Sequence, residues 1–110
     1  MATNYKILGQ SKPGAATQTT LYTVPASTQA IVSSLVVCNQ SATATSFRIN
    51  LDVDGGGDES KEYIYYDLPI DGNDTFIATI GATLGSTDLI RCYNTLATCS
   101  FTAFGSEIDE

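Results

Sequence analysis

The chain has 110 residues, of which 43% are hydrophobic and 15% charged, so it is long enough for one globular domain with a single core. It carries 12 Asp and Glu, 5 Lys and Arg and no His, and the resulting net charge of −7 argues against binding to nucleic acid or to an anionic membrane. The N-terminal sequence MATNYKILGQ lacks the apolar core of a signal peptide, so we expect a protein that is made and used without export.

The charges are divided unevenly along the chain. Residues 1–50 contain three cations (Lys6, Lys12 and Arg48) and no acid, which gives +3. Residues 51–110 contain all 12 acids and two cations, which gives −10, and the two halves sum to −7. Chance combined with solubility is one interpretation. The other is that the basic N-terminal half docks on an acidic partner surface.

Residues 1–19 form the first element of the chain. An apolar patch, which includes Tyr5, is followed by the break Lys12-Pro13-Gly14 and by a spacer of small residues. This pattern predicts either an ordered first strand or an arm that embraces a partner, ahead of a β-sandwich domain over residues 20–110. The candidate partner-binding residues of this segment are Tyr5, Lys6, Ile7, Leu8 and Lys12.

Strand patterns dominate the rest of the chain. In SFRINLDV, Phe47, Ile49, Leu51 and Val53 alternate with polar residues, which is typical of a half-buried antiparallel strand. No helical pattern exceeds about one turn. We therefore predict an all-β fold, a single antiparallel β-sandwich of seven or eight strands with jelly-roll or immunoglobulin-like connectivity. The other expected strands cover residues 19–25, 29–39, 62–70, 74–84, 88–95 and 100–108.

The stretch from Ser33 to Gly57 reads as one hairpin that ends in an exposed acidic loop, DVDGGGDES. Closely spaced Asp residues are typical calcium ligands, so Asp52, Asp54 and Asp58 are candidate cation ligands. The calcium-loop pattern fails, however, because its fifth position is Gly56 and its twelfth is Tyr63. A solvated loop without a metal is the expected outcome.

Three tyrosines gather in EYIYYDLPI. Alternation places Tyr63 and Tyr65 on one face of the strand and Tyr66 with Ile64 on the other. Ordinary strand packing is one interpretation, and an intersubunit contact through Tyr63 and Tyr65 is the other.

The three cysteines read as small apolar core residues with free thiols. A second possibility concerns Cys92 and Cys99. If residues 88–95 and 99–108 form a hairpin that turns near Thr95 and Leu96, these two cysteines lie directly opposite each other, where a disulfide is possible.

The chain has few of the residue types and motifs on which catalysis usually depends. Without His, the chain lacks the commonest general base and cannot build a Ser–His or Cys–His nucleophile, and DGGGDES is no phosphate-binding loop. We expect a protein that is not an enzyme, with no catalytic residues and no cofactor.

The order of several motifs resembles small virion structural proteins of tailed bacteriophages, and those of phages that infect cyanobacteria are most similar. The motifs are LYTVPA, SSLVVCN, DLPIDGND, LGSTD and FGSEI, and the resemblance spans about residues 17–108. It implies a non-catalytic β-sandwich of the assembled virion, made in the cytoplasm of the host bacterium. The expected function is that of a capsid decoration (cement) protein, a homotrimer that binds the major capsid protein or another virion protein. A neck, tail, baseplate or fibre component is the alternative, and a carbohydrate-binding module that uses the tyrosines is a third.

Overall fold

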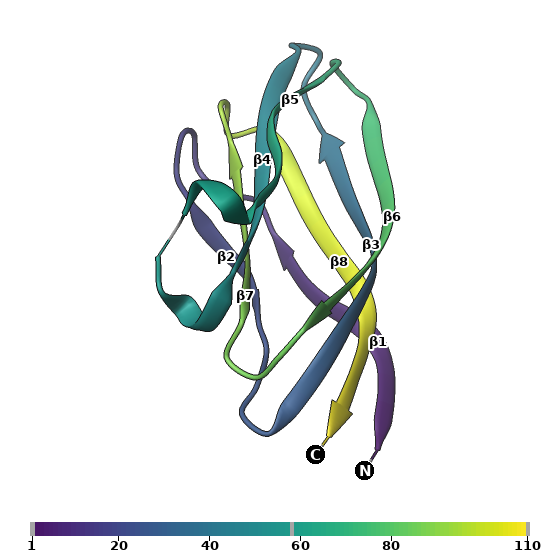
Figure 1. Cartoon of the computed structure of the whole chain (residues 1–110). Helices are drawn as coiled ribbons and strands as arrows, with labels where there is room; N and C mark the ends of the chain where they lie inside the picture. Colours follow the sequence, from purple (N-terminus) through teal and green to yellow (C-terminus); the bar gives the residue numbers. More distant parts are fainter. Residues whose placement is uncertain (1, 58, 110) are drawn as a thin grey trace.

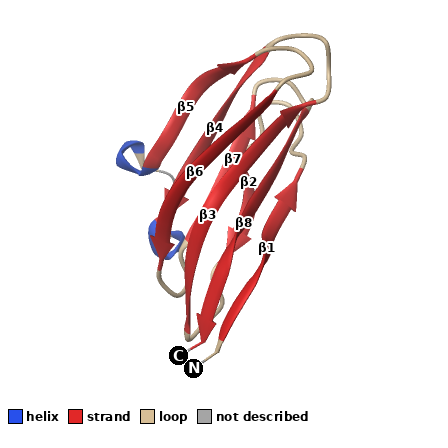
Figure 2. Cartoon of the chain, turned by 90° about the vertical axis from the view of Figure 1, so that its right-hand side faces the viewer, coloured by secondary structure: helices blue, strands red, loops and turns tan. Residues whose placement is uncertain are grey.

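Two four-stranded antiparallel sheets face each other in the computed structural model, which describes residues 2–57 and 59–109 (Figures 1 and 2). The first sheet has the strand order β1-β8-β3-β6, and the second has the order β2-β7-β4-β5. Two short 3-10 helices, η1 and η2, follow β4 on the side of the second sheet. The bounds are β1 Thr3–Ser11, β2 Thr19–Thr23, β3 Thr28–Asn39, β4 Thr45–Asp52, η1 Val53–Gly55, η2 Ser60–Glu62, β5 Tyr63–Ile70, β6 Thr75–Leu84, β7 Leu89–Asn94 and β8 Cys99–Asp109.

The connectivity is that of a jelly roll. Consecutive strands change sheets at every connection except the one from β4 to β5, and the resulting orders 1-8-3-6 and 2-7-4-5 are those of two interleaved Greek keys. An immunoglobulin sandwich instead distributes its strands as ABED and CFG. The predicted all-β sandwich is therefore confirmed, and its connectivity is that of the jelly roll.

The expected hairpin between Ser33 and Gly57 is wrong. Strand β3 pairs with β6 and β8 in the first sheet, whereas β4 pairs with β5 and β7 in the second. The Ser, Thr and Ala linker between them carries the chain from one sheet across to the other. Alternation of apolar residues predicts which face of a strand is buried, but it contains no information about the neighbouring strand.

The N-terminal segment is an ordered edge strand and not a projecting arm. Strand β1 pairs with β8 along its whole length, from Thr3 opposite Ile108 to Ser11 opposite Phe101. Its residue Leu8 is 8% exposed and belongs to the core. Deletion of residues 1–12 would therefore remove one strand of the first sheet and part of the core.

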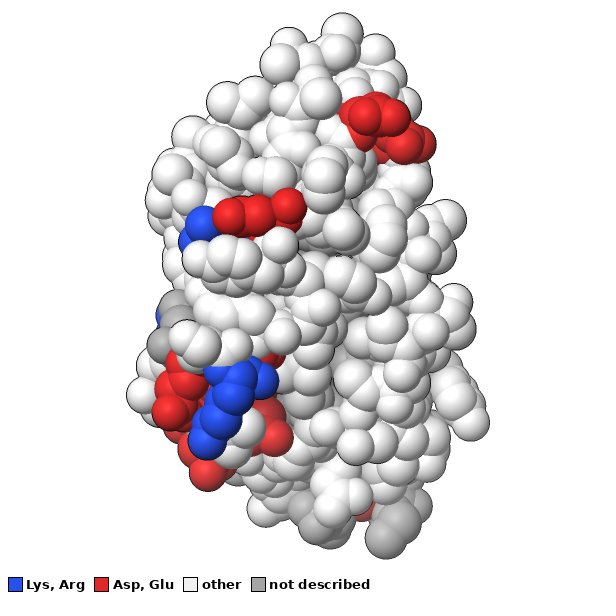
Figure 3. Space-filling model, turned by 45° about the horizontal axis from the view of Figure 1, so that its top comes forward, with Lys and Arg blue, Asp and Glu red and all other residues white. Residues whose placement is uncertain are grey.

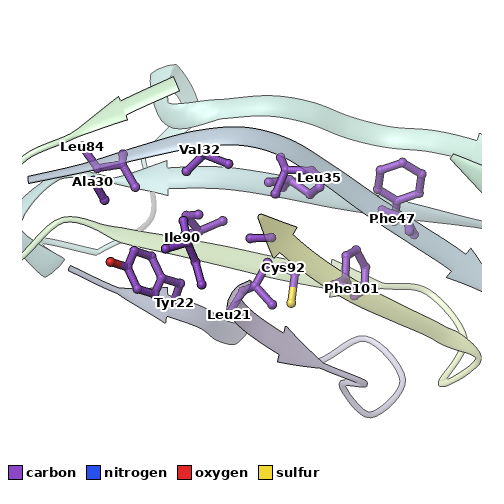
Figure 4. Close-up of a cluster of buried hydrophobic side chains, with 14 of the residues drawn as sticks. Leu21, Tyr22, Ala30, Val32, Leu35, Phe47, Leu84, Ile90, Cys92 and Phe101 are labelled. Carbon is purple, nitrogen blue, oxygen red and sulfur yellow. The ribbon is translucent and has the colours of Figure 1, made fainter. Parts of the chain in front are cut away.

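The core lies between the two sheets and is filled from both (Figure 4). Phe47 of β4 is fully buried, and its ring packs against Tyr65 of β5, Phe76 of β6 and Phe101 of β8. This one side chain thus contacts one other strand of its own sheet and two strands of the facing sheet. Within the described part of the chain, no helix is long and apolar enough to span a membrane.

Pro69 lies inside a strand and does not end it. Strand β5 continues to Ile70, with Pro69 opposite Ser46 of β4. Since β5 is the edge strand of its sheet, its second side has no neighbouring strand, so a missing N–H on that side costs no ladder hydrogen bond.

Candidate interaction surfaces

The outer face of the second sheet carries an arginine clamped between two aromatic rings. The guanidinium carbon of Arg48 lies 4.3 Å from the ring centre of Tyr66 and 4.4 Å from that of Tyr93. Arg48 also donates from Nε to Asp67 Oδ1 (2.6 Å) and from Nη2 to Asp67 Oδ2 (3.3 Å). The hydrogen bond that Arg48 donates to Asp67 raises the pKa of Arg48. Arg48, a cation of the N-terminal half, is therefore already engaged by an acid of the C-terminal half.

The expected arrangement of the three tyrosines is wrong. Tyr65 points inward and packs against Phe47 and Phe76, whereas Tyr63 and Tyr66 contact each other edge to face with ring centres 5.0 Å apart. The register between β4 and β5 shifts twice along this strand, so strict alternation fails. Tyr63 and Tyr65 consequently form no joint contact surface. The three rings also form no flat platform for a sugar.

The acidic loop folds over the second sheet and is held there. Glu62 accepts hydrogen bonds from the backbone N–H of Val53 (3.0 Å) and of Glu59 (3.1 Å), so its carboxylate joins the two ends of the loop. Asp88 accepts from the N–H of Asp54 (3.0 Å), which ties the loop to the turn before β7. Hydrogen bonds therefore hold the described ends of the loop, while residues 53–57 and 59–61 are exposed to solvent, as expected.

The two described candidate cation ligands, Asp52 and Asp54, each contact a different residue. Asp52 is fully buried beside Arg91, with 3.3 Å between Asp52 Oδ2 and Arg91 Nε. Asp54 accepts from the hydroxyl of Thr87 (2.8 Å), and Asp58 lies outside the described residues. Over residues 2–57 and 59–109, no group of three or more His, Cys, Asp or Glu side chains is placed to hold a metal ion.

A polar triad lies where β1, β2 and β8 meet. The hydroxyl of Tyr22 donates to Glu107 Oε2 (2.5 Å), and Lys6 Nζ donates to Glu107 Oε1 (3.1 Å). The hydrogen bond from Tyr22 lowers the pKa of Glu107, while burial, followed by this hydrogen bond, raises the pKa of Tyr22. Lys12 in turn donates to Gln40 Oε1 (3.0 Å). The basic half of the sequence therefore presents no free basic face, because Lys6 and Arg48 are paired with acids that follow residue 50.

The triad gives an alkaline pH dependence that can be measured. Below the ordinary Tyr pKa of 10.0, Tyr22 is protonated in both the folded and the unfolded chain, so its contribution to stability is complete. Above that pH the unfolded chain ionises first, and the contribution is lost as the pH rises toward the higher folded pKa. We expect Tyr22→Phe to destabilise the protein by about 1–3 kcal/mol near pH 8 and by less near pH 11, measured by urea unfolding. An equal loss at both pH values would contradict this account.

Cys92 and Cys99 do not face each other on a hairpin. Cys92 of β7 pairs with Thr19 and Ile49 in the second sheet, whereas Cys99 of β8 pairs with Asn39 in the first. All three cysteines, with Cys38, are free thiols. The free-thiol interpretation therefore agrees with the structure, and the alternative disulfide does not form because the chain changes sheets between β7 and β8.

Thiol labelling is expected to report this arrangement. Burial raises the pKa of Cys92 to about 12 and also raises that of Cys99, and both side chains are fully buried. A thiol that stays protonated and shielded does not react with a disulfide reagent, whereas Cys38 is half-buried on the outer face. We expect one thiol to react in the folded protein near pH 8 and all three after unfolding in urea. Cys38→Ser is the control, and a fast reaction that persists in this variant would contradict the burial of the other two.

The outer face of the first sheet has no charged side chain. Its four strands contain three charged residues, Lys6, Glu107 and Asp109. Lys6 and Glu107 lie in cross-strand rows with core residues such as Val32, and Asp109 lies at the end of the sheet. The outward rows hold only Ser, Thr, Gln and apolar residues. The three central rows are Tyr5–Ser106–Ile31–Thr83, Ile7–Phe104–Ser34–Thr79 and Gln10–Thr102–Val36–Ile77.

This surface, which we call the uncharged face, exposes large apolar side chains. Tyr5 is 85% exposed and Ile77 is 65% exposed, and Ile7, Ile31 and Phe104 are partly exposed as well. Tyr5, Ile31 and Phe104 line a shallow groove along β1, β8 and β3, together with Lys6, whose Nζ is bound to Glu107. In Figure 3 most of the charged side chains gather on the left, on the side of the second sheet and the 3-10 helices, a further acidic group lies at the upper right, and much of the rest of the right side is white.

Sequence reasoning found only part of this surface. Tyr5 and Ile7 were candidates and lie on the uncharged face, whereas Leu8 is in the core. Ile31, Ile77 and Phe104 were missed, although their strands contain almost no charged residues, which was the available signal. No protein-family model matches the chain, and no curated protein matches it either.

Proposed function

We propose that the chain is a non-enzymatic structural protein of a phage virion, and specifically a capsid decoration protein that binds and stabilises the assembled head. The observation that carries the proposal is the uncharged face, a broad sheet surface of a jelly roll with exposed Tyr and Ile side chains. Charge depletion and exposed aromatic residues are features of surfaces that bind proteins. The motif resemblance to virion proteins is the reason for proposing a phage virion as the particle. The jelly roll is also a fold that viral capsid proteins use.

The mechanism is thermodynamic linkage. A protein that binds the assembled lattice but not its separated subunits adds its binding free energy to the stability of the lattice. Each copy needs a contact of about 1,000 Å² or more for specific binding. The net charge of −7 keeps exposed copies soluble and repels them from packaged DNA.

The contact with the shell differs from the one expected from the sequence. A basic arm that grips an acidic shell is not available, because β1 is part of the sheet and Lys6 is paired with Glu107. The proposal therefore relies on contacts of the folded sandwich with the major capsid protein or another virion protein.

The test is the number of copies in purified particles, measured by quantitative mass spectrometry against the major capsid protein. A decoration protein follows the symmetry of the shell, so we expect on the order of hundreds of copies. About six to a few dozen copies would place the chain in the neck, tail, baseplate or fibres, which is the alternative virion function. Complete absence from the particles would refute both.

A further inference from the structure

We propose that the uncharged face is the contact between two copies of this chain, which form a two-fold symmetric dimer with their first sheets packed face to face. The dimer is a property of the purified chain and goes beyond the proposed function in the virion; because both use the uncharged face, a copy that binds the shell through this face has left the dimer. A dimer without binding to particles, or binding without a dimer, would therefore separate the two proposals.

The absence of charged side chains from the outward rows of this face favours a second copy of the chain as its binding partner. Each copy carries a net charge of −7, so two copies repel each other wherever their acidic surfaces meet. The outward rows of β1, β8, β3 and β6 hold no Asp, Glu, Lys or Arg. Two such faces can approach each other without opposing like charges and without burying an unpaired charge. A binding partner that is attracted by charge would instead bind at the loops outside this face, which carry Asp54, Glu59 and Asp88.

Symmetry favours a dimer over the trimer expected from the sequence. In a two-fold contact the same surface lies on both sides, so the uncharged face meets itself. In a cyclic trimer it would meet a different surface of the next copy. The acids and the clamped Arg48 lie on those other surfaces, which makes that pairing electrostatically less favourable.

The size of the face is sufficient for a stable contact. Its strands contain 9, 11, 12 and 10 residues. With strands about 4.8 Å apart and about 3.3 Å per residue, the face measures roughly 19 by 33 Å, or about 1,200 Å² for both copies together. This value is at the lower end of the range for specific interfaces, so we expect a dissociation constant on the order of micromolar.

The experiment measures the mass of the purified full chain by sedimentation velocity over roughly 1–200 µM. Tyr5→Asp and Ile77→Asp each place a new acid on the uncharged face, and both side chains are mostly exposed in the single chain, so the fold is retained. Because the two-fold axis duplicates each new charge, we expect dimerisation to weaken at least about 100-fold in both variants. Ile64→Asp is the matched control, since Ile64 is 40% exposed on β5 of the other sheet, and its dissociation constant should change less than about threefold.

Salt gives an independent readout. Screening reduces the repulsion between two acidic copies, so the dimer should tighten as NaCl rises from about 50 to about 500 mM. A monomer at every concentration, a trimer, an equal effect of Ile64→Asp, or a dimer that weakens with salt would each overturn the proposal. Circular dichroism of each variant verifies that the fold is intact.

Discussion

Gly105→Ala is expected to lower the free energy of unfolding by roughly 3 kcal/mol or more, a larger loss than most single methyl additions cause. A Cβ atom at Gly105 would lie 2.0 Å from the backbone oxygen of Ile31 and 3.1 Å from Leu8 Cδ1. Gly105 lies between β1 and β3, beside the register shift between Val32 and Ser34 of β3. A backbone oxygen held in a sheet cannot move aside as a flexible side chain can, so the ladder itself must shift.

Gly56→Ala is the matched control for this substitution. Gly56 has a φ of −77°, which any residue adopts, and the nearest atom to an added Cβ would be Val53 O at 3.5 Å, an ordinary contact. We expect its urea midpoint, followed by circular dichroism because the chain has no Trp, to lie close to that of the wild type. Equal midpoints for the two variants would show that the sheet accommodates a methyl group at Gly105.

Phe47→Ala is expected to destabilise the protein by about 3–5 kcal/mol. The side chain is fully buried, and its ring contacts Tyr65, Phe76 and Phe101, so truncation leaves a cavity between the two sheets. Typical domains of this size are stable by about 5–15 kcal/mol, so a large part of the total is lost. Urea unfolding measures the difference.

Val53→Ala is the control for the effect of truncating an apolar side chain. Val53 is 58% exposed in η1, and we expect a change within about 0.5 kcal/mol. A loss below about 1 kcal/mol for Phe47→Ala would mean that the surrounding rings close the cavity, and the central position of Phe47 in the core would then be wrong.

Some of the residues predicted to lie on an interaction surface are exposed there, and others are buried. Tyr5 and Ile7 were predicted because an apolar patch in a polar segment stands out, and both are exposed on the uncharged face. The same patch contains Leu8, which is buried, because adjacent residues of a strand point to opposite faces of the sheet. The segment DVDGGGDES was expected to be an exposed acidic loop, and its residues 53–57 are exposed, whereas its first acid, Asp52, is fully buried.

The sequence by itself determined the strands and, for most of them, the buried face. Alternation in residues 46–51 correctly placed Phe47 and Ile49 in the core, since the side-chain period of a strand is a local property. The length and composition of the chain also indicated one domain and an acidic surface.

The tertiary structure alone decided which strands are neighbours and what covers each outer face. Asn50 and Asp52 alternate outward as predicted, yet both are fully buried, and Asp52 lies beside Arg91 next to the folded acidic loop. Cys92 and Cys99 are seven positions apart but lie in different sheets, since the jelly-roll connection crosses between the layers. Alternation is set by neighbouring residues, whereas pairing and register depend on contacts between residues far apart in the chain. Only those contacts gather the uncharged rows of four separate strands into one surface.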